Sequence, residues 1–504
     1  MNDKKPSRLV RWLKRIAFTL AVLITLVAVV VIFENWRGNR AWRNYLAEQE
    51  AKGEVLDWRK LVPPPVPDDQ NFAKTPLLAK LTDYTYDPRT GKVVFADPAG
   101  YARLNGIFAW QNLNVIKGKG AWRKATQTDW PALQASLRAL TNSELPAAKA
   151  LLARPAGKPV NDVLFLIAQN KAELDEIAAV GRLPHANFGV HYEEGIMALL
   201  PQLSVIKNFA VAIQLRSLAE LEAGQLELAL ADWQMVLALG ETLKADPLLI
   251  TLLVRIAVQD ISHQVIWEGL SQRKWTDAQL QTIEERLAGI NLVAEALSAL
   301  RGERAFGMLA LDQMHLRSAN GLPRPGDIGI PSLPLLPSGW VSQNKLTIAR
   351  MYDRFIFGAF DPAKQRVDIK LARQYEREVE ATLGKFGPYT LMARMLFPAI
   401  SKAGIKVAST QTALHLARVA CALERHRLAD GKYPADLSAL VPRFLPKLPV
   451  DLDEQPLRYQ LEANGQFTLY SIGSDLVDDQ GRIGKSSPRV TVDEGDWVWK
   501  YPAP

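Results

Sequence analysis

The chain has very little cysteine, since Cys421 is the only one in 504 residues. An intrachain disulfide is therefore excluded, and the fold must be stabilised by its core, which a chain of this length can bury. Cys421 lies among apolar residues of a predicted helix, which indicates a core side chain rather than a nucleophile. The sequence also lacks G-x-S-x-G, a phosphate-binding loop, a dinucleotide fingerprint and H-E-x-x-H. No motif therefore indicates a particular reaction.

Excess charge is missing from most of the chain. Residues 1–15 contain six basic side chains and one acid, so this leader carries +5 of the formal net charge of +8, which leaves +3 for all other residues. A nearly neutral surface is not typical of nucleic-acid binding, so we expect no nucleic-acid partner. The basic leader is typical of a topology signal that lies against anionic lipid headgroups.

Charge is absent altogether from residues 16–33, IAFTLAVLITLVAVVVIF. About 18–20 apolar residues cross a bilayer as a helix, so this run predicts a transmembrane helix. Because the excess of Lys and Arg precedes it, we expect the N-terminus to be cytoplasmic. A cleaved signal peptide is the alternative, but its apolar core is shorter and a small-residue cleavage site follows it. Here Phe33-Glu34-Asn35-Trp36 follows, which favours an uncleaved, single-pass anchor in the inner (cytoplasmic) membrane.

The predicted fold class is mainly α, with an exported helical domain and a small C-terminal α+β module. Trp36 to Lys60 reads as a helix that leaves the membrane, with Trp36, Trp42 and Tyr45 suited to the interface belt. Proline and glycine positions divide the chain. The segments are a cytoplasmic leader (1–15), the transmembrane helix (16–33), a membrane-proximal helix with a Pro-rich spacer (34–76), a helical domain (77–320), a Pro/Gly-rich loop (321–342), a helical continuation (343–404), the C-terminal module (405–485) and a tail (486–504).

Shorter patterns subdivide these segments. Turn and strand signals in Tyr84 to Asp97 predict a short hairpin. After the Pro/Gly-rich loop, helices are expected over the ranges Gln343–Ala359, Pro362–Leu383 and Ser401–Asp430. One helical pair, near residues 213–240, resembles the middle of a tetratricopeptide repeat through Gly224, Leu226, Ala229 and Trp233. Since no second copy is visible, we interpret it as a repeat-like helical hairpin within a larger helical domain.

The C-terminal module is the best-defined part of the sequence. Its helix should end at Asp430-Gly431, and one face of that helix carries Leu416, Ala420 and Leu423. Asn464-Gly465 is a strong hairpin signal between two predicted strands. A two-residue loop would pair Leu461 with Thr468 and Tyr459 with Tyr470.

This order of elements resembles the globular domain of type II secretion major pseudopilins. The matching stretches run from Ala422 to Pro434, Leu440 to Pro442, Leu457 to Tyr459 and Phe467 to Asp475. Ala17-Phe18-Thr19-Leu20 is also similar to the prepilin pattern, but the expected glycine is Ala17 and the expected glutamate is Val22. About 370 residues also separate the apolar run from the module, whereas in a pseudopilin the globular domain follows its N-terminal helix closely.

The resemblance implies a calcium site in the loop after the hairpin. Asp475, Asp478 and Asp479 lie within five residues there, between Gly473 and Gly481. Carboxylate oxygens in a tight loop suit a hard cation such as calcium. A solvated acidic turn without metal is the alternative. No other cofactor is expected.

Two further sets of residues have side chains that could form a site. His185 and His191 are followed by Glu193 and Glu194, and Asp312 lies three residues before His315. Neither spacing matches a known metal motif, and acids are common in the first turn of a helix. We therefore interpret both sets as surface groups rather than catalytic residues.

The sequence as a whole favours a non-enzymatic role. We interpret the chain as a membrane-anchored scaffold or interaction protein of the cell envelope, with most of the chain periplasmic or otherwise extracytoplasmic. Its expected partners are the membrane and an envelope protein; an association with secretion or pilus-type machinery rests on the resemblance alone. The alternatives are an envelope hydrolase with a site between the helical domain and the C-terminal module, and a divergent pseudopilin filament subunit processed before Phe18.

The topology is directly testable. A reporter fused after Pro504 should be active only outside the cytoplasm, because the basic excess lies before the apolar run. The matched measurement uses a second reporter, active only in the cytoplasm, at the same position. Activity of the cytoplasmic reporter would contradict the predicted orientation.

Overall fold

The computed structural model describes residues 8–87, 92–112, 115–140, 146–319, 337–384, 387–486 and 489–502. It is mainly helical, as predicted. The helices are α1 (Arg8–Ala51), α2 (Pro76–Thr82), α3 (Pro98–Gly106), α4 (Trp130–Arg138), α5 (Pro146–Leu152), α6 (Pro159–Ala168), α7 (Lys171–Ile177), α8 (Pro201–Glu222), α9 (Leu226–Glu241), α10 (Leu249–Ser271), α11 (Asp277–Ala288), α12 (Leu292–Ala319), α13 (Ser338–Phe355), α14 (Ile369–Gly384) and α15 (Leu391–Asp430). The strands are β1 (Tyr84–Tyr86), β2 (Val93–Phe95), β3 (Phe360–Asp361), β4 (Arg366–Val367), β5 (Arg458–Leu461), β6 (Phe467–Ser471), β7 (Ile483–Ser486), β8 (Arg489–Gly495) and β9 (Trp497–Lys500).

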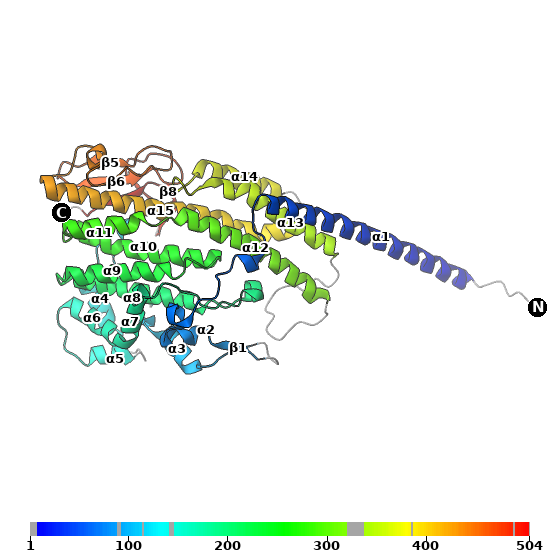
Figure 1. The fold of residues 1–504 in the computed structure, drawn as a ribbon, viewed down its shortest axis with the longest axis horizontal. Helices are drawn as coiled ribbons and strands as arrows, with labels where there is room; N and C mark the ends of the chain where they lie inside the picture. The colour runs from blue at the N-terminus through cyan, green and yellow to red at the C-terminus, as the bar shows by residue number, and fades with distance from the viewer. Residues whose placement is uncertain are drawn as a thin grey trace, which may run out of the picture.

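The first helix is much longer than a membrane span. α1 joins the apolar run and the predicted membrane-proximal helix without a break, and its N-terminal half projects from the domain (Figure 1). An 18-residue window within it has a mean hydropathy of 3.1 and no buried residues, so α1 could span a membrane. α10 is also apolar enough, but 67% of its window is buried, as in a core helix. The helix predicted to reach Lys60 ends at Ala51, just before Gly53 adopts a left-handed φ of 77°.

The body of the domain is a stack of helices. Figure 1 shows α8, α9, α10, α11 and α15 as successive layers, with the C-terminal strands on the outer side of α15. The predicted hairpin near residues 213–240 is present as α8 and α9, which turn at Gly224 with φ 76°. The two helices pack closely at Ala229, whose carbonyl accepts a hydrogen bond of 2.6 Å from the Ser217 hydroxyl. Trp233 is fully buried beside them.

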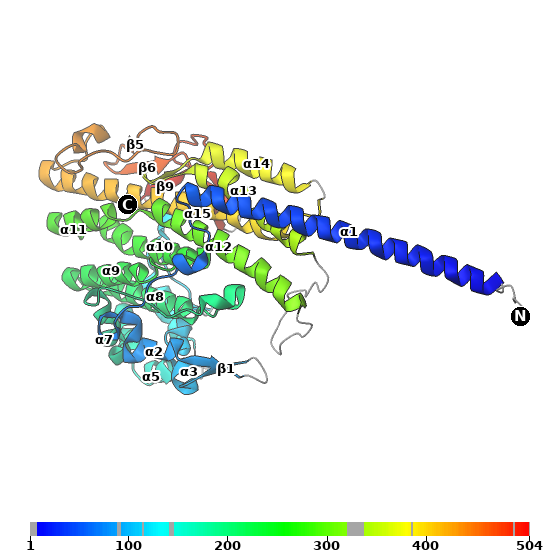
Figure 2. The ribbon, with the colours of Figure 1, turned by 45° about the vertical axis from the view of Figure 1, so that its right-hand side comes forward.

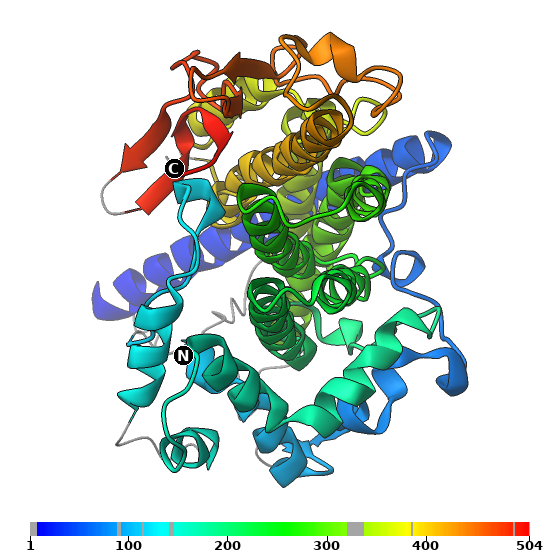
Figure 3. The ribbon, with the colours of Figure 1, turned by 90° about the vertical axis from the view of Figure 1, so that its left-hand side faces the viewer.

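The middle of α15, residues 407–424, is buried on nearly all sides rather than along one face. Leu416, Ala420 and Leu423 are at most 1% exposed, which confirms that these residues lie in the core. Arg418, off that apolar face, lies against another helix instead of water, and it pairs with Glu284 of α11 at 2.8 Å. A helix covered all round occupies the centre of a domain. In Figure 3 α15 accordingly lies between the other helices of the stack and the C-terminal strands.

The C-terminal hairpin is present, but its predicted register is wrong. Tyr459 is paired with Leu469, and Leu461 with Phe467. The loop contains three residues rather than two, because Glu462 and Gln466 still share a backbone hydrogen bond of 2.8 Å and Gly465 takes the left-handed position, with φ 76°. A shift of one residue exchanges the two faces of a strand, and it places Leu469 opposite Trp499 of β9.

The predicted tail contains structure that completes the core. β8 and β9 lie within residues 486–504, and β9 forms the third strand of the sheet, in the order β5-β6-β9. Trp499 is fully buried, and Trp267 of α10 donates a hydrogen bond of 3.0 Å to the carbonyl of Lys500. One continuous core includes α8, α9, α10, α11, α15 and the sheet. The C-terminal region and the helical domain are therefore packed as one body.

Other boundaries differ locally from the predictions. The hairpin in Tyr84 to Asp97 is confirmed as β1 and β2. The helix predicted from Pro362 begins at Ile369, because β3 and β4 form a small hairpin before it. The helix predicted from Ser401 begins at Leu391. α13 begins at Ser338, inside the predicted Pro/Gly-rich loop, and residues 320–336 of that loop lie outside the described residues.

Leu423→Asp should destabilise the protein strongly. Leu423 is fully buried, so the substitution places an unpaired carboxylate in the core at a cost of several kcal/mol. Leu428→Asp is the matched control, since Leu428 lies on the same helix and is 44% exposed. We expect a clear fall in melting temperature for the first variant and a change within about 0.5 kcal/mol for the second. Equal melting of both variants would contradict the packing of α15.

Candidate functional site

The acidic loop that the sequence predicts as a calcium site is held by hydrogen bonds to its own backbone and to the neighbouring strands β6 and β8. The Asp475 carboxylate accepts hydrogen bonds from the backbone N–H groups of Gly495 (2.7 Å) and Val477 (3.2 Å). Asp478 accepts from the N–H of Gln480 (2.9 Å) and from the Tyr470 hydroxyl (3.2 Å). Both carboxylates therefore stabilise the loop and fix it to β8 and β6.

A fourth carboxylate, which the sequence did not indicate, lies in the same loop region. Asp496 is 2% exposed and accepts hydrogen bonds from the N–H groups of Gly481 (2.7 Å) and Asp479 (3.3 Å). Burial, together with the charges of Asp478 and Asp479, raises the pKa of Asp496 to about 6. Within the described ranges, no group of three or more His, Cys, Asp or Glu side chains is placed to hold a metal. Calcium therefore stays a prediction from the resemblance and the residue types.

The other sequence candidates are distributed over separate places. His191 lies 3.1 Å from Glu193, an exposed pair, and its ring packs against Tyr84. His185 is fixed by backbone hydrogen bonds to Gln70 and Phe72. Asp312 pairs with Lys345 of α13 at 2.8 Å. Cys421 is fully buried, and burial raises the pKa of its thiol, as expected for a core side chain.

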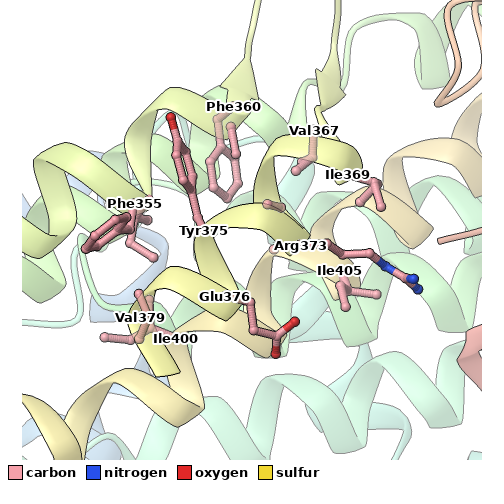
Figure 4. Close-up of a pocket in the computed structure, with 14 residues that line it drawn as sticks. Phe355, Phe360, Val367, Ile369, Arg373, Tyr375, Glu376, Val379, Ile400 and Ile405 are labelled. Atoms are coloured by element: carbon pink, nitrogen blue, oxygen red, sulfur yellow. The ribbon is translucent and has the colours of Figure 1, made fainter. Parts of the chain in front are cut away.

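A small apolar pocket lies between the end of α13, the β3–β4 hairpin, α14 and α15 (Figure 4). Its walls are mainly aromatic and aliphatic, and Arg373, Tyr375 and Glu376 of α14 supply polar groups. The cavity volume is about 40 Å³, whereas sites for small-molecule ligands usually measure about 300–1,000 Å³. None of its described lining residues is a serine, cysteine, histidine or aspartate. The pocket is therefore a poor candidate for the site of a hydrolase.

A group of buried charged side chains joins α8 to α9. Arg216 of α8 binds the carboxylate of Asp232 of α9 through two hydrogen bonds of 2.5 and 2.6 Å. Glu220 lies beside this pair, and burial, together with the charge of Asp232, raises the pKa of Glu220 well above its usual range. These groups join two helices and do not open into a described cavity.

The contact between α1 and α13 is made by two glycines. Gly38 and Gly339 face each other with their backbones in contact: a Cβ atom on Gly38 would lie 2.2 Å from the Gly339 carbonyl oxygen. A Cβ atom on Gly339 would lie 2.0 Å from the carbonyl oxygen of Glu34. Small residues permit such close packing of helices. Because both positions lack a side chain, the two helices can approach with their backbones touching.

Polar side chains fix the register of this contact. The Asn35 side-chain oxygen accepts a hydrogen bond of 2.8 Å from the backbone N–H of Gly339. One turn further along α1, the Asn39 side-chain oxygen accepts from the Ser342 hydroxyl (2.7 Å), and its amide donates to Ser338 (3.1 Å). These bonds pair two successive turns of α1 with the first turns of α13.

An ionic network around a buried arginine lies at the end of the α1–α13 contact that is nearer the C-terminus of each helix. Arg304 of α12 has no exposed surface and binds both Asp353 of α13 and Glu54, each at 2.7 Å. Tyr45 of α1 donates to the same Asp353 carboxylate at 2.7 Å. Although burial opposes it, Arg304 and Arg301 hold the pKa of Glu54 below its usual range. Tyr45, predicted for the membrane interface, is therefore a buried docking residue.

Only a weak signal in the sequence points to this docking site. Gly38, Asn35 and Asn39 follow the apolar run at helical spacing, but their partners lie about 300 residues later. Gly339 also lies within the predicted Pro/Gly-rich loop. In a single sequence no pattern connects the two segments.

The calcium prediction can be tested on the full chain. A cation bound only by the folded state stabilises it by RT ln(1 + [L]/Kd), about 2.7 kcal/mol at a hundredfold excess over Kd. If the loop binds calcium, millimolar calcium should raise the melting temperature relative to chelator, and Asp478→Ala should remove the increase. Equal melting temperatures with calcium and with chelator would support the alternative of an acidic turn without metal.

No protein-family model, curated protein or solved structure matches this chain. The similarity to pseudopilins and to a tetratricopeptide hairpin therefore remains a prediction that rests on the residues quoted above. Among the described residues, α1 docks onto α13 through Asn35 and Tyr45, and Arg304 of α12 joins this contact through Asp353.

Proposed function

We propose that the protein is a membrane-anchored scaffold of the cell envelope, whose helical domain is held in one orientation at the membrane surface. The observation that carries this proposal is the backbone contact of Gly38 with Gly339, which begins within five residues of the end of the apolar run at Phe33. The helix in the membrane and the helix docked on the domain are the same helix, α1.

Continuity of α1 distinguishes this arrangement from a flexible tether. A tethered domain needs a spacer between its anchor and its first contact, but here Asn35 already binds Gly339. The Pro-rich segment comes later and packs on the domain, where the carbonyl of Pro64 accepts a hydrogen bond of 2.9 Å from Asn187. It therefore does not separate the domain from the membrane. A domain oriented in this way suits the presentation of a fixed surface to an envelope partner.

Two alternatives have less support. A hydrolase would be favoured by catalytic side chains that converge in a deep pocket, and the pocket described above is small and mainly apolar. In a pseudopilin filament subunit the globular domain follows its N-terminal helix closely. Here α1 docks on α13, and the C-terminal sheet lies toward the end of the domain away from the N-terminus (Figure 1). The basic leader supports a cytoplasmic N-terminus and an extracytoplasmic domain.

Gly339→Ala tests the docking, with Gly307→Ala as the matched control. A Cβ atom at Gly339 meets backbone at 2.0 Å, so the helices must separate, at a cost of about 1–3 kcal/mol. Gly307 lies in α12, and a Cβ atom added there would have no neighbour within 4 Å, so its substitution should be neutral or stabilise the helix by up to about 1 kcal/mol. Thermal unfolding in detergent measures both effects. An unchanged melting temperature for Gly339→Ala would contradict the docking.

The scaffold role itself requires a partner. After crosslinking in membranes, the wild type and Gly307→Ala should capture the same envelope protein, whereas Gly339→Ala should capture less of it because the domain is no longer held in one orientation. Failure of the wild type to capture any envelope protein above background would contradict the scaffold role, even if the docking is confirmed.

A further inference from the structure

The position of the membrane surface can be read from α1. The uncharged run ends at Phe33, and Glu34 and Arg37 form an ion pair of 2.8 Å directly after it. Charged side chains are costly inside the hydrocarbon region, so the surface of the bilayer crosses α1 close to this pair. This inference rests on α1 spanning the membrane, as proposed above.

Two other parts of the domain lie at the same level. The Arg37 guanidinium donates a hydrogen bond of 2.7 Å to the hydroxyl of Tyr389, which lies just before α15, and is 5.3 Å from the centre of its ring. Asn35 binds Gly339 in the first turn of α13. Figure 2 shows the start of α13 beside the part of α1 that leaves the domain. The starts of α13 and α15 are therefore at the height of the lipid headgroups.

Exposed side chains at this level match a lipid interface. Trp36 is 56% exposed and Leu391, the first residue of α15, is 44% exposed. Tryptophan is enriched where a membrane meets water, and a nearby apolar side chain can enter the boundary between headgroups and acyl chains. Arg40 is also exposed, with its guanidinium 5.5 Å from the ring centre of Trp36, and can contact lipid phosphates.

We propose that this end of the domain, formed by Trp36, Tyr389 and Leu391, rests on the surface of the bilayer that α1 spans. The partner is the lipid surface itself. Continuity with the membrane span favours lipid: the lipid-facing run of α1 reaches the ion pair to which Tyr389 is hydrogen-bonded, and Leu391 follows Tyr389 by two residues. The domain then contacts the membrane at two places, along α1 and at the start of α15, which limits its tilt.

The chain is well suited to a test by single-cysteine labelling. Its one native thiol, Cys421, is fully buried, so labels at new surface cysteines have little background. Leu391 and Leu428 lie on the same helix and are both 44% exposed. At 1.5 Å rise per residue they are roughly 55 Å apart along α15. Leu391→Cys and Leu428→Cys are therefore matched in exposure and differ in their distance from the membrane.

The experiment uses the full chain in lipid nanodiscs, with an environment-sensitive fluorophore on each cysteine and lipids that carry a spin-label quencher on the headgroup. We expect the label at Leu391→Cys to lose most of its emission and the label at Leu428→Cys to keep it. Val27→Cys, in the apolar run, serves as the control for insertion, and lipids with the quencher deep in the acyl chain should quench its label.

Each other outcome has a distinct meaning. If the label at position 27 is quenched and the label at position 391 is not, the surface contact is overturned while membrane anchoring stands. If the label at position 391 is shielded both from headgroup quenchers and from a water-soluble quencher, a protein covers this surface instead, which also overturns the proposal. If the label at position 27 is not quenched, α1 does not span the bilayer, and the proposed function fails with it.

Discussion

The backbone contact between Gly38 and Gly339 is the constraint on which the rest of this structure depends. It brings α1 against α13 so closely that Asn35 and Asn39 reach polar groups of the first turns of α13. The buried charge of Arg304 then joins Asp353 and Glu54 at the far end of the contact. A buried charge is tolerated only when it is paired, so this network requires one relative position of α1, α12 and α13.

A second organising element is α15, which packs against both the helices of the stack and the C-terminal sheet. On one side it pairs Arg418 with Glu284 of α11, and on the other it is covered by the C-terminal sheet, where Leu469 lies opposite Trp499. Trp267 of α10 binds the backbone of β9 directly. The sheet is therefore part of the core of the helical stack. Its contribution to stability cannot be separated from that of the helices.

These two elements run from the apolar N-terminal segment to the far end of the molecule. α1 enters the domain at the start of α13, and α15 runs from that same end to the C-terminal hairpin (Figure 1). Both are continuous helices, which transmit orientation better than loops do. A domain built in this way can present a surface at a defined distance from the bilayer, and this supports the scaffold role that we propose.

Local patterns in the sequence determined much of the secondary structure. The uncharged run predicted the long apolar N-terminal helix, Gly224 predicted the turn between α8 and α9, and Gly431 predicted the end of α15. Each of these depends on residues that are neighbours in the chain. The loop of the C-terminal hairpin was predicted one residue too short, because Asn-Gly occurs in hairpin loops of more than one length and packing against Trp499 favours one face of the strand.

Only the tertiary structure decided which distant segments meet. The docking of α1 depends on Gly339, about 300 residues after Gly38, and the carboxylate of Asp496 joins a loop whose predicted members were Asp475, Asp478 and Asp479. Arg418 lies off the apolar face that the sequence predicts for α15, yet it pairs with Glu284 of α11 inside the domain. Periodicity reports which side of a helix is apolar, whereas the partner of a charge or the neighbour of a glycine depends on the packing of the whole chain.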